Sequence, residues 1–214
     1  MYKIKKIFYS LQGEGTNSGR PAVFCRFSGC NLWSGLEKDR ATAACVFCDT
    51  DFRESDSVGG GVYSDPRRLA DDIASLWPKQ DHNDIRTKPF VVLTGGEPLL
   101  QVDESLITAL HDREFQVALE TNGTLPASKN IDWITVSPKA GIELVQKWGN
   151  ELKLVFPQKK VDPVIFTELR FDHFCLQPLD DCNSCENTKM AIDYCLKNPL
   201  WRLSLQTHKL LGID

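Results

Sequence analysis

The sequence predicts an α/β fold: a partial, open (β/α) barrel of about six parallel strands with reduced helix content, in a single domain spanning residues 1–214. Short apolar runs rich in β-branched and aromatic residues recur along the chain, and amphipathic segments separate only some of them. The gaps after residues 120, 137 and 156 are about a dozen residues long, too short for full helices. A closed barrel with eight helices therefore does not fit.

Each expected element follows from its local pattern. The predicted strands are residues 22–27, 90–94, 115–120, 133–137, 151–156, 173–177 and 202–206, with a short strand before the turn at 12–15. The predicted helices are residues 65–77, 103–112 and 187–197. The first of these helices has Asp65 as its N-cap and Pro66 at its first helical position. The glycine-rich stretch 58–62 is expected to be a loop.

Composition narrows the class of protein. Hydrophobic residues make up 42% of the chain and charged residues 25%, which is ordinary globular usage and excludes disordered or collagen-like proteins. No apolar run has the length of a membrane span, and the first residues lack a signal-peptide core. The net charge of −4 gives no basic face for nucleic acid. Eight cysteines without a secretion signal indicate metal ligands or core packing in a reducing cytoplasm.

Polar residues gather where the predicted strands end, at Cys30, 94–97, 120–122, 137–139 and Gln177. In open parallel α/β folds the chemistry lies at the carboxyl ends of the strands. We therefore expect these residues to meet around one site.

The cysteine motif is the strongest functional signal. Cys45 and Cys48 form a CxxC pair, and fourteen residues separate Cys30 from Cys45. Three incidental core cysteines are one interpretation, and a structural zinc site is another, but no fourth ligand is near in sequence. Three thiolates on a loop suit a four-iron cluster that leaves one iron open for a cofactor.

Two segments carry groups that could hold a cofactor and a metal. In TGGEP (94–98), two glycines would let the backbone approach a ligand, and Glu97 could accept hydrogen bonds from an ammonium group. Asp49 and Thr50 could hold Mg²⁺, although a loop N-cap is the simpler interpretation.

Two further segments could bind a substrate. In LQGEG (11–15), Gln12 and Glu14 could read the amidine-like edge of a heterocycle such as a pterin, or the segment could be only a tight turn. Arg26 lies on an apolar strand and would either pair with an acid of the protein or clamp a substrate carboxylate.

The motifs LQGEG, CRFSGC, Cx14CxxCDT, TGGEP, ETNG, SPK and QP occur in this order across residues 11–178, and WRLSLQTHK follows at 201–209. In this arrangement the chain resembles the radical S-adenosylmethionine (SAM) superfamily and, within it, the 7-carboxy-7-deazaguanine synthase family. The resemblance covers nearly the whole chain, and LQGEG and the spaced cysteine motif are its specific parts.

The resemblance implies a role for each motif residue. A [4Fe-4S] cluster would be ligated by Cys30, Cys45 and Cys48, and Mg²⁺ by Thr50. SAM would be bound by Phe47, Cys48, Asp49, Gly96, Glu97, Ser137, Pro138, Lys139, Gln177, Pro178, Leu179 and Asp180. The substrate would be held by Gln12, Gly13, Glu14, Arg26, Thr94 and the C-terminal Asp214, with Arg26 and Glu14 as catalytic residues.

The implied activity is a radical lyase reaction that converts 6-carboxy-5,6,7,8-tetrahydropterin to 7-carboxy-7-deazaguanine with loss of ammonia, a step of queuosine biosynthesis. The implied partners are an electron donor such as flavodoxin and a second copy of the chain in a homodimer. Two alternatives stay open here: a radical SAM activase acting on a protein glycyl residue, and a non-catalytic zinc-binding module. A second CxxC pair, Cys182 and Cys185, has no role in the resemblance.

Overall fold

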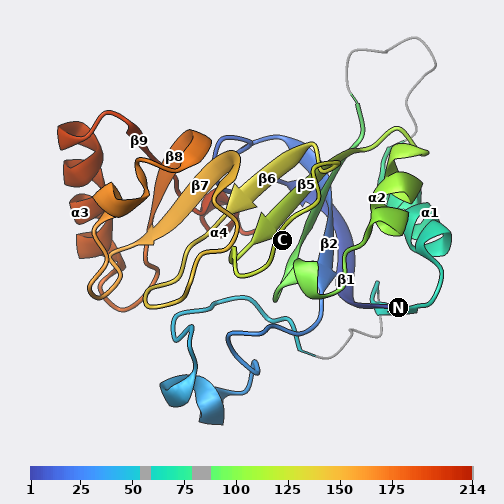
Figure 1. The fold of residues 1–214 in the computed structure, drawn as a ribbon, viewed down its shortest axis with the longest axis horizontal. Coiled ribbons are helices and arrows are strands. Elements are labelled where there is room, and N and C mark those ends of the chain that lie inside the picture. The colour runs from blue at the N-terminus through green and yellow to red at the C-terminus, as the bar shows by residue number, and fades with distance from the viewer. Residues whose placement is uncertain (54–58, 79–87, 214) are drawn as a thin grey trace.

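The computed structural model describes residues 1–53, 59–78 and 88–213, and their nine strands form one sheet of order β3-β1-β2-β4-β5-β6-β7-β8-β9 (Figure 1). The parallel strands are β2 (Pro21–Phe27), β4 (Phe90–Gly95), β5 (Gln116–Thr121), β6 (Trp133–Val136), β7 (Trp148–Phe156), β8 (Arg170–Pro178) and β9 (Trp201–Leu203). At one edge, β1 (Tyr2–Leu11) and β3 (Gly61–Tyr63) run antiparallel. The predicted α/β fold with an open, mostly parallel sheet is confirmed.

Helices cover the sheet unevenly. The α-helices are α1 (Pro66–Leu76), α2 (Glu104–His111), α3 (Ser184–Lys197) and α4 (Thr207–Leu211), and the 3₁₀ helices are η1 (Glu37–Thr42), η2 (Pro98–Leu100) and η3 (Pro163–Phe166). The predicted cap of α1 is confirmed, because the Asp65 side chain accepts a hydrogen bond from the Arg67 amide. The connections after β5 and β6, both fully described, hold no helix, and the one after β7 holds only η3.

The N-terminal edge of the sheet differs from the sequence prediction. In the stretch expected as a loop at 58–62, Val58 lies outside the described residues, whereas Gly61 and Val62 belong to β3 and pair with Ile4 and Lys3. Glycine disfavours strands, which hides this element in the sequence, but the open edge of β1 supplies a pairing partner. At the opposite edge the predicted strand 202–206 is shorter and begins at Trp201.

Side chains alternate between the two faces of the sheet. On β4, Val91 and Leu93 pack into the main core under α1 and α2, whereas Phe90 and Val92 belong to a smaller cluster on the other face. On β2, Phe24 shares this second face with Arg26, two residues further along the strand. We call this second face the inner face, because the curved sheet wraps around it.

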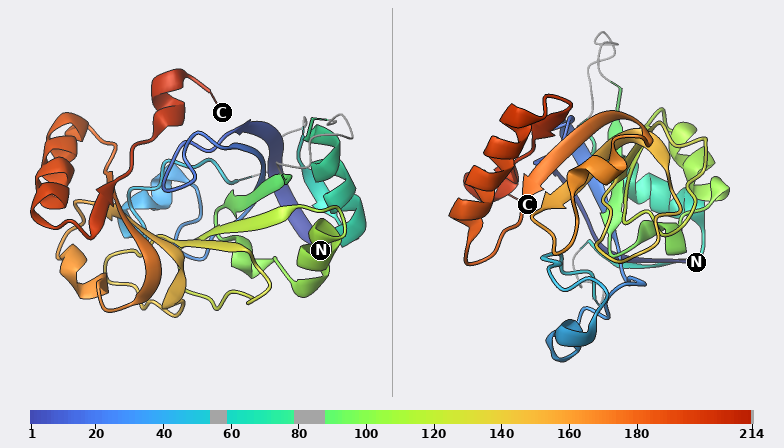
Figure 2. Two further views of the ribbon diagram at one scale, coloured as in Figure 1. Left: turned by 90° about the horizontal axis from the view of Figure 1, so that it is seen from above. Right: turned by 60° about the vertical axis from the view of Figure 1, so that its left-hand side comes forward.

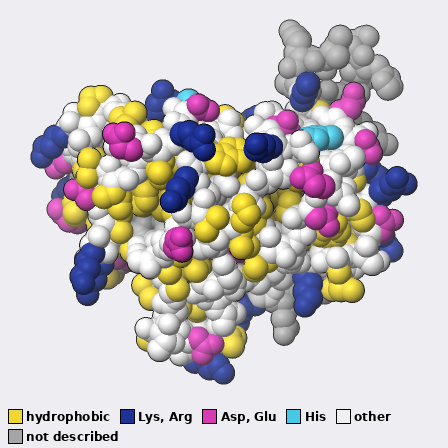
Figure 3. Space-filling model, in the orientation of Figure 1, with side chains coloured by type: hydrophobic (Ala, Val, Ile, Leu, Met, Phe, Trp, Pro, Cys, Tyr) yellow, Lys and Arg dark blue, Asp and Glu magenta, His cyan; other side chains and the backbone are white. Residues whose placement is uncertain are grey.

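The sheet curves into an open arc (left view of Figure 2). Helices α1 and α2 lie outside one end of the arc, α3 lies outside the other end, and α4 lies over the space between them. On the face seen in Figure 3, basic, acidic and apolar side chains are interspersed. Among the described residues, none of the helices combines the length and apolarity needed to span a bilayer.

Candidate active site

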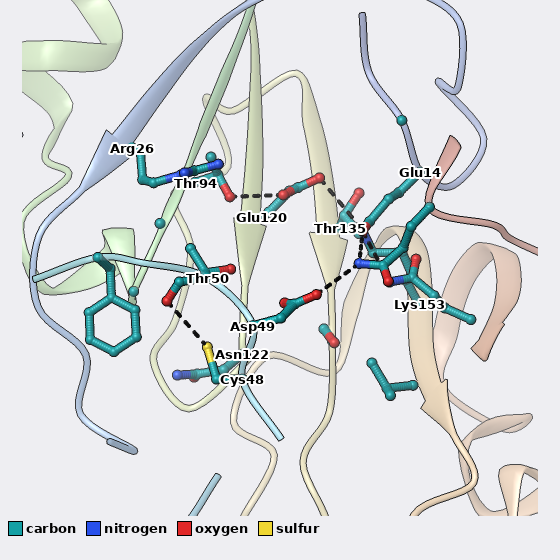
Figure 4. Close-up of a pocket in the computed structure, with 18 of the residues that line it drawn as sticks. Glu14, Arg26, Cys48, Asp49, Thr50, Thr94, Glu120, Asn122, Thr135 and Lys153 are labelled. Carbon is teal, nitrogen blue, oxygen red and sulfur yellow. Dashed lines mark hydrogen bonds and ion pairs between the residues drawn. The ribbon is translucent and has the colours of Figure 1, made fainter. Parts of the chain in front are cut away.

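A cavity of about 310 Å³ opens on the inner face, at the carboxyl ends of the parallel strands (Figure 4). The predicted site residues that line it are Gln12, Gly13, Glu14, Arg26, Cys30, Cys45, Phe47, Cys48, Asp49, Thr50, Thr94, Gly96, Ser137, Lys139, Gln177, Pro178, Leu179 and Asp180. Glu97 and Pro138 do not contribute to the lining, and Asp214 lies outside the described residues. The strand-end residues that the sequence singled out therefore do meet around one space.

The cysteine loop (residues 28–53) brings its three motif cysteines, Cys30, Cys45 and Cys48, to this cavity. The Leu32 amide donates a hydrogen bond to the Cys30 sulfur at 3.4 Å, and the Arg40 guanidinium donates to the backbone oxygen of Cys48 at 3.0 Å. Burial raises the pKa of both the Cys30 and the Cys48 thiol, and the nearby Cys45 acts in the same direction. The loop thus presents three neighbouring sulfur donors to one pocket.

The glycines of TGGEP allow two chain segments to pack closely. A Cβ added at Gly95 would lie 2.3 Å from the Phe27 carbonyl oxygen, and one added at Gly96 would lie 2.0 Å from the carbonyl oxygen of Gly29. The amide of Glu97 donates to that same Gly29 oxygen at 2.9 Å. These glycines thus let the end of β4 dock against the start of the cysteine loop.

Glu97 does not contribute to the cavity lining, and its predicted contact with SAM stays a prediction. It is fully buried, and its carboxylate accepts hydrogen bonds from the Thr121 hydroxyl and from the amides of Asn122 and Leu99 at 2.8–2.9 Å. Burial raises its pKa, although these hydrogen bonds act in the opposite direction. Through these hydrogen bonds Glu97 joins the turn after β4 to the turn after β5.

The SPK segment after β6 places one cation beside the cysteines. Lys139 donates to the carbonyl oxygen and the hydroxyl of Ser137 at 2.7 and 2.8 Å and lies 5.9 Å from the centre of the Phe47 ring. Burial lowers the pKa of Lys139, and the nearby Cys45 and Cys48 raise it in part. Pro138 is buried behind this segment, where its carbonyl oxygen accepts from Gln158 at 3.2 Å.

Arg26 projects from β2 into the cavity (Figure 4). Its guanidinium lies over the Phe8 ring, 5.3 Å from the ring centre, and its buried Nε atom has no hydrogen-bond partner among the described residues. A buried donor of this kind costs free energy unless a ligand satisfies it. Of the two interpretations open from the sequence, the geometry favours a ligand clamp over an internal ion pair.

A buried charged group, which we call the Lys153 cluster, occupies the other side of the cavity. It consists of Lys153 and three carboxylates, Glu14, Glu120 and Glu151. Lys153 forms ion pairs with Glu14 at 2.5 Å and with Glu120 at 3.5 Å. Burial alone would raise the pKa of Glu14, but the charge and hydrogen bond of Lys153 outweigh it, so the pKa is lowered.

The C-terminal segment, from Gln206 to Lys209, lies over the cavity beside the Lys153 cluster. Gln206 donates to Glu14 at 2.9 Å and to Asp49 at 3.1 Å. Lys209 donates to Asp49 and to Asp180, both at 2.6 Å. Burial would raise the pKa of Asp49, but the bonds from Lys209 and Gln206 lower it.

Comparison with known proteins identifies the family. The 7-carboxy-7-deazaguanine synthase of Bradyrhizobium diazoefficiens is 57% identical over 212 residues, which are 99% of each chain, and that of Caulobacter vibrioides is 53% identical with the same coverage. The chain belongs to the 7-carboxy-7-deazaguanine synthase family. The crystal structure of QueE from Escherichia coli matches with a TM-score of 0.68 and 26% identity, covering 95% of this chain and 93% of that one. No family model matches the chain.

Family membership makes the chain an enzyme and implies radical SAM chemistry with a [4Fe-4S] cluster and SAM. The donor set fits a cluster, since Cys30, Cys45 and Cys48 are neighbouring soft sulfur ligands that line one pocket. Within the described ranges, no group of three or more His, Cys, Asp and Glu side chains is suited to hold a single metal ion. Cys182 and Cys185 lie apart from the cavity lining and are exposed at the start of α3.

The sequence analysis assigned no site role to several lining residues, namely Thr135, Lys153, Gln206 and Lys209. Lys153 had a signal in the sequence. Along β7 the buried Leu152 and Leu154 alternate with Glu151 and Lys153, so one face of this strand is charged. In a strand that is buried on both faces, such an alternation marks the residues that face a cavity.

Proposed function

We propose that this chain is a radical SAM lyase that converts 6-carboxy-5,6,7,8-tetrahydropterin to 7-carboxy-7-deazaguanine with loss of ammonia. The observation that carries the proposal is the buried, unpartnered Nε of Arg26 in the same cavity as three cysteines. A planar guanidinium in this setting matches the carboxylate of such a substrate. Family membership at 57% identity supports the same reaction over a protein activase or a zinc module.

In the proposed site, one part of the cavity binds the cluster and SAM, which we call the SAM side, and the other part binds the substrate. Cys30, Cys45 and Cys48 would hold the cluster, with the SAM site formed by Phe47, Asp49, Gly96, Ser137, Lys139 and residues 177–180. When bound, the cluster and SAM supply the radical that removes hydrogen from the substrate. Arg26 would hold the substrate carboxylate at the β2 side, and Gln12, Glu14 and Thr94 would hold the ring, so that the reacting carbon faces the SAM side.

Magnesium would bind between the two sides. Thr50 lines the cavity directly after Asp49, and a hydroxyl oxygen with a substrate carboxylate and waters is a ligand set that Mg²⁺ accepts. The carboxylate of Asp49 already accepts from Lys209 and Gln206, so we assign the metal to Thr50. We further propose that residues 1–214 form one domain, that it works in the cytoplasm as a homodimer, and that flavodoxin reduces it.

The deciding experiment is an anaerobic assay of the reconstituted protein with SAM, dithionite, Mg²⁺ and the carboxylated tetrahydropterin. We expect 7-carboxy-7-deazaguanine, identified by mass and ultraviolet spectrum, and none from Cys30→Ala. Cleavage of SAM without any change in the pterin would overturn the substrate assignment. A protein that stays colourless after iron and sulfide are supplied would overturn the cluster assignment.

A further inference from the structure

Lys153 occupies an unusual position for a lysine. It projects from β7 onto the inner face with only 7% of its side chain exposed, among the three carboxylates of its cluster. Burying a charge costs several kcal/mol, on the order of the benefit from its partners, so a buried ion pair is weak evidence for a role in stability. The role of Lys153 is therefore better judged from the groups that its ammonium contacts than from its burial.

The contacts lead directly to the proposed substrate residues. Glu120, which pairs with Lys153, accepts hydrogen bonds from Gln12 Nε2 at 3.1 Å and from the Thr94 hydroxyl at 2.8 Å. The Gln12 side-chain oxygen in turn accepts from the Glu14 amide at 3.1 Å, and the Glu14 carboxylate returns to Lys153. Residues from the loop after β1, from β4, from β5 and from β7 thus form one connected network around a single ammonium group (Figure 4).

We propose that Lys153 is a positioning residue for substrate recognition, which holds the carboxylates of Glu14 and Glu120 in their orientation toward the cavity. This inference rests on the proposed function. Neighbouring carboxylates in a pocket need a cation beside them, and a carboxylate is a hydrogen-bond acceptor only. They would select a substrate edge that carries N–H donors, such as the 2-amino-4-oxopyrimidine edge of a pterin, and would disfavour edges that present acceptors.

The charges around Glu14 fix the expected pH behaviour. Lys153 on β7 is its nearest cation, Gln177 on β8 and Gln206 before α4 donate to it, and His208 on α4 lowers its pKa further. Glu120 on β5 and Glu151 on β7 are the other carboxylates near Lys153. Without Lys153, burial would dominate and the pKa of Glu14 would rise. The acidic limb of kcat/KM for the pterin would then move to higher pH.

The test compares Lys153→Met with Lys147→Met, the same substitution at an exposed lysine six residues earlier on the same chain segment. For Lys153→Met we expect kcat/KM for the carboxylated tetrahydropterin to fall by about 100-fold, as for a misplaced positioning group, with iron content and SAM affinity unchanged. Equilibrium binding of the pterin should weaken in parallel, and the acidic limb should move upward. Lys147→Met should match the wild type in every measurement.

A double variant guards against misfolding, because Lys153→Met alone leaves carboxylates without a countercharge. Lys153→Met with Glu14→Gln removes both members of the closest pair. If Lys153 acts through Glu14, the double variant loses little more activity than the worse single variant. Independent, multiplicative losses, or wild-type kinetics and an unmoved pH limb in Lys153→Met, would overturn the positioning role. Failure of the wild type to convert the pterin would instead overturn the proposed function, whatever Lys153 does.

Discussion

At the scale of single residues, Arg26 and Gly96 show two different ways in which one side chain, or its absence, serves the cavity. Arg26 offers a donor that the described protein leaves unsatisfied, next to the aromatic face of Phe8. Gly96 offers space that backbone fills, since the Gly29 carbonyl oxygen lies where its Cβ would be. Arg26 is therefore available to bind a ligand, whereas Gly96 allows the cysteine loop to pack against the end of β4.

Replacement of Arg26 separates substrate binding from cluster assembly. We expect Arg26→Ala to reduce turnover of the carboxylated tetrahydropterin by at least about 100-fold, because the substrate loses its orienting clamp. Iron content and SAM binding should stay unchanged, since no hydrogen bond joins the Arg26 side chain to a cysteine among the described residues. Arg26→Lys keeps the charge without the planar fork and should recover only part of the activity. Normal turnover in Arg26→Ala, measured anaerobically, would contradict the clamp.

Replacement of Gly96 should act on the cluster instead. In Gly96→Ala the new methyl meets the Gly29 oxygen at 2.0 Å and the Cys30 Cβ at 3.1 Å, so the start of the cysteine loop must shift. We expect a loss of unfolding free energy of about 1–3 kcal/mol, together with reduced iron content after reconstitution. Gly19→Ala is the control, since its φ of +86° adds strain but its Cβ meets nothing within 4 Å. Equal iron content in the two variants would refute the docking role of Gly96.

At the scale of elements, sequence patterns predicted those parts whose cause is local. The Asp65-Pro66 start of α1 follows from capping chemistry, and its cap hydrogen bond is present at 2.9 Å. Strand β3 was not predicted because it forms through its pairing with β1, which lies far from it in the sequence. The alternation on β7 was visible, but its charged face could be assigned to the cavity only once the register with β6 and β8 was known.

The cap of α1 gives a quantitative check on this local reasoning. Asp65→Ala removes the acceptor for the Arg67 amide and should lower the unfolding free energy by about 1 kcal/mol. For a chain of this size that corresponds to a fall in Tm of about 2–4 °C. Asp65→Asn keeps the acceptor and should stay close to the wild type. Urea denaturation of the two reconstituted variants measures their unfolding free energies. An unchanged urea midpoint in Asp65→Ala would show that the cap is dispensable.

At the scale of the whole molecule, an open sheet leaves the mouth of its cavity exposed, and the C-terminal segment covers it. Thr207 donates to the Gly13 carbonyl oxygen at 2.9 Å through both its amide and its hydroxyl. Lys209 joins the cysteine loop, through Asp49, to the segment after β8, through Asp180. Two of these contacts join distant parts of the sequence, with a separation of 194 residues between Thr207 and Gly13 and of 160 between Lys209 and Asp49. Motif analysis treats each segment separately and could not have paired them.

Because Lys209 helps to hold the C-terminal segment over the cavity opening, its replacement should loosen this segment without changing the fold. Lys209 is 38% exposed, and exposed ion pairs contribute about 0–1 kcal/mol each, so Lys209→Met should leave Tm nearly unchanged. The tail should nonetheless lose its hold on both cofactor segments, with a several-fold rise in the KM for SAM and faster proteolysis after residue 205. Lys197→Met, at the exposed end of α3, provides the matched control. Wild-type KM and tail protection in Lys209→Met would contradict this role of Lys209 and assign the closure to the other described contacts, such as those of Gln206 and Thr207.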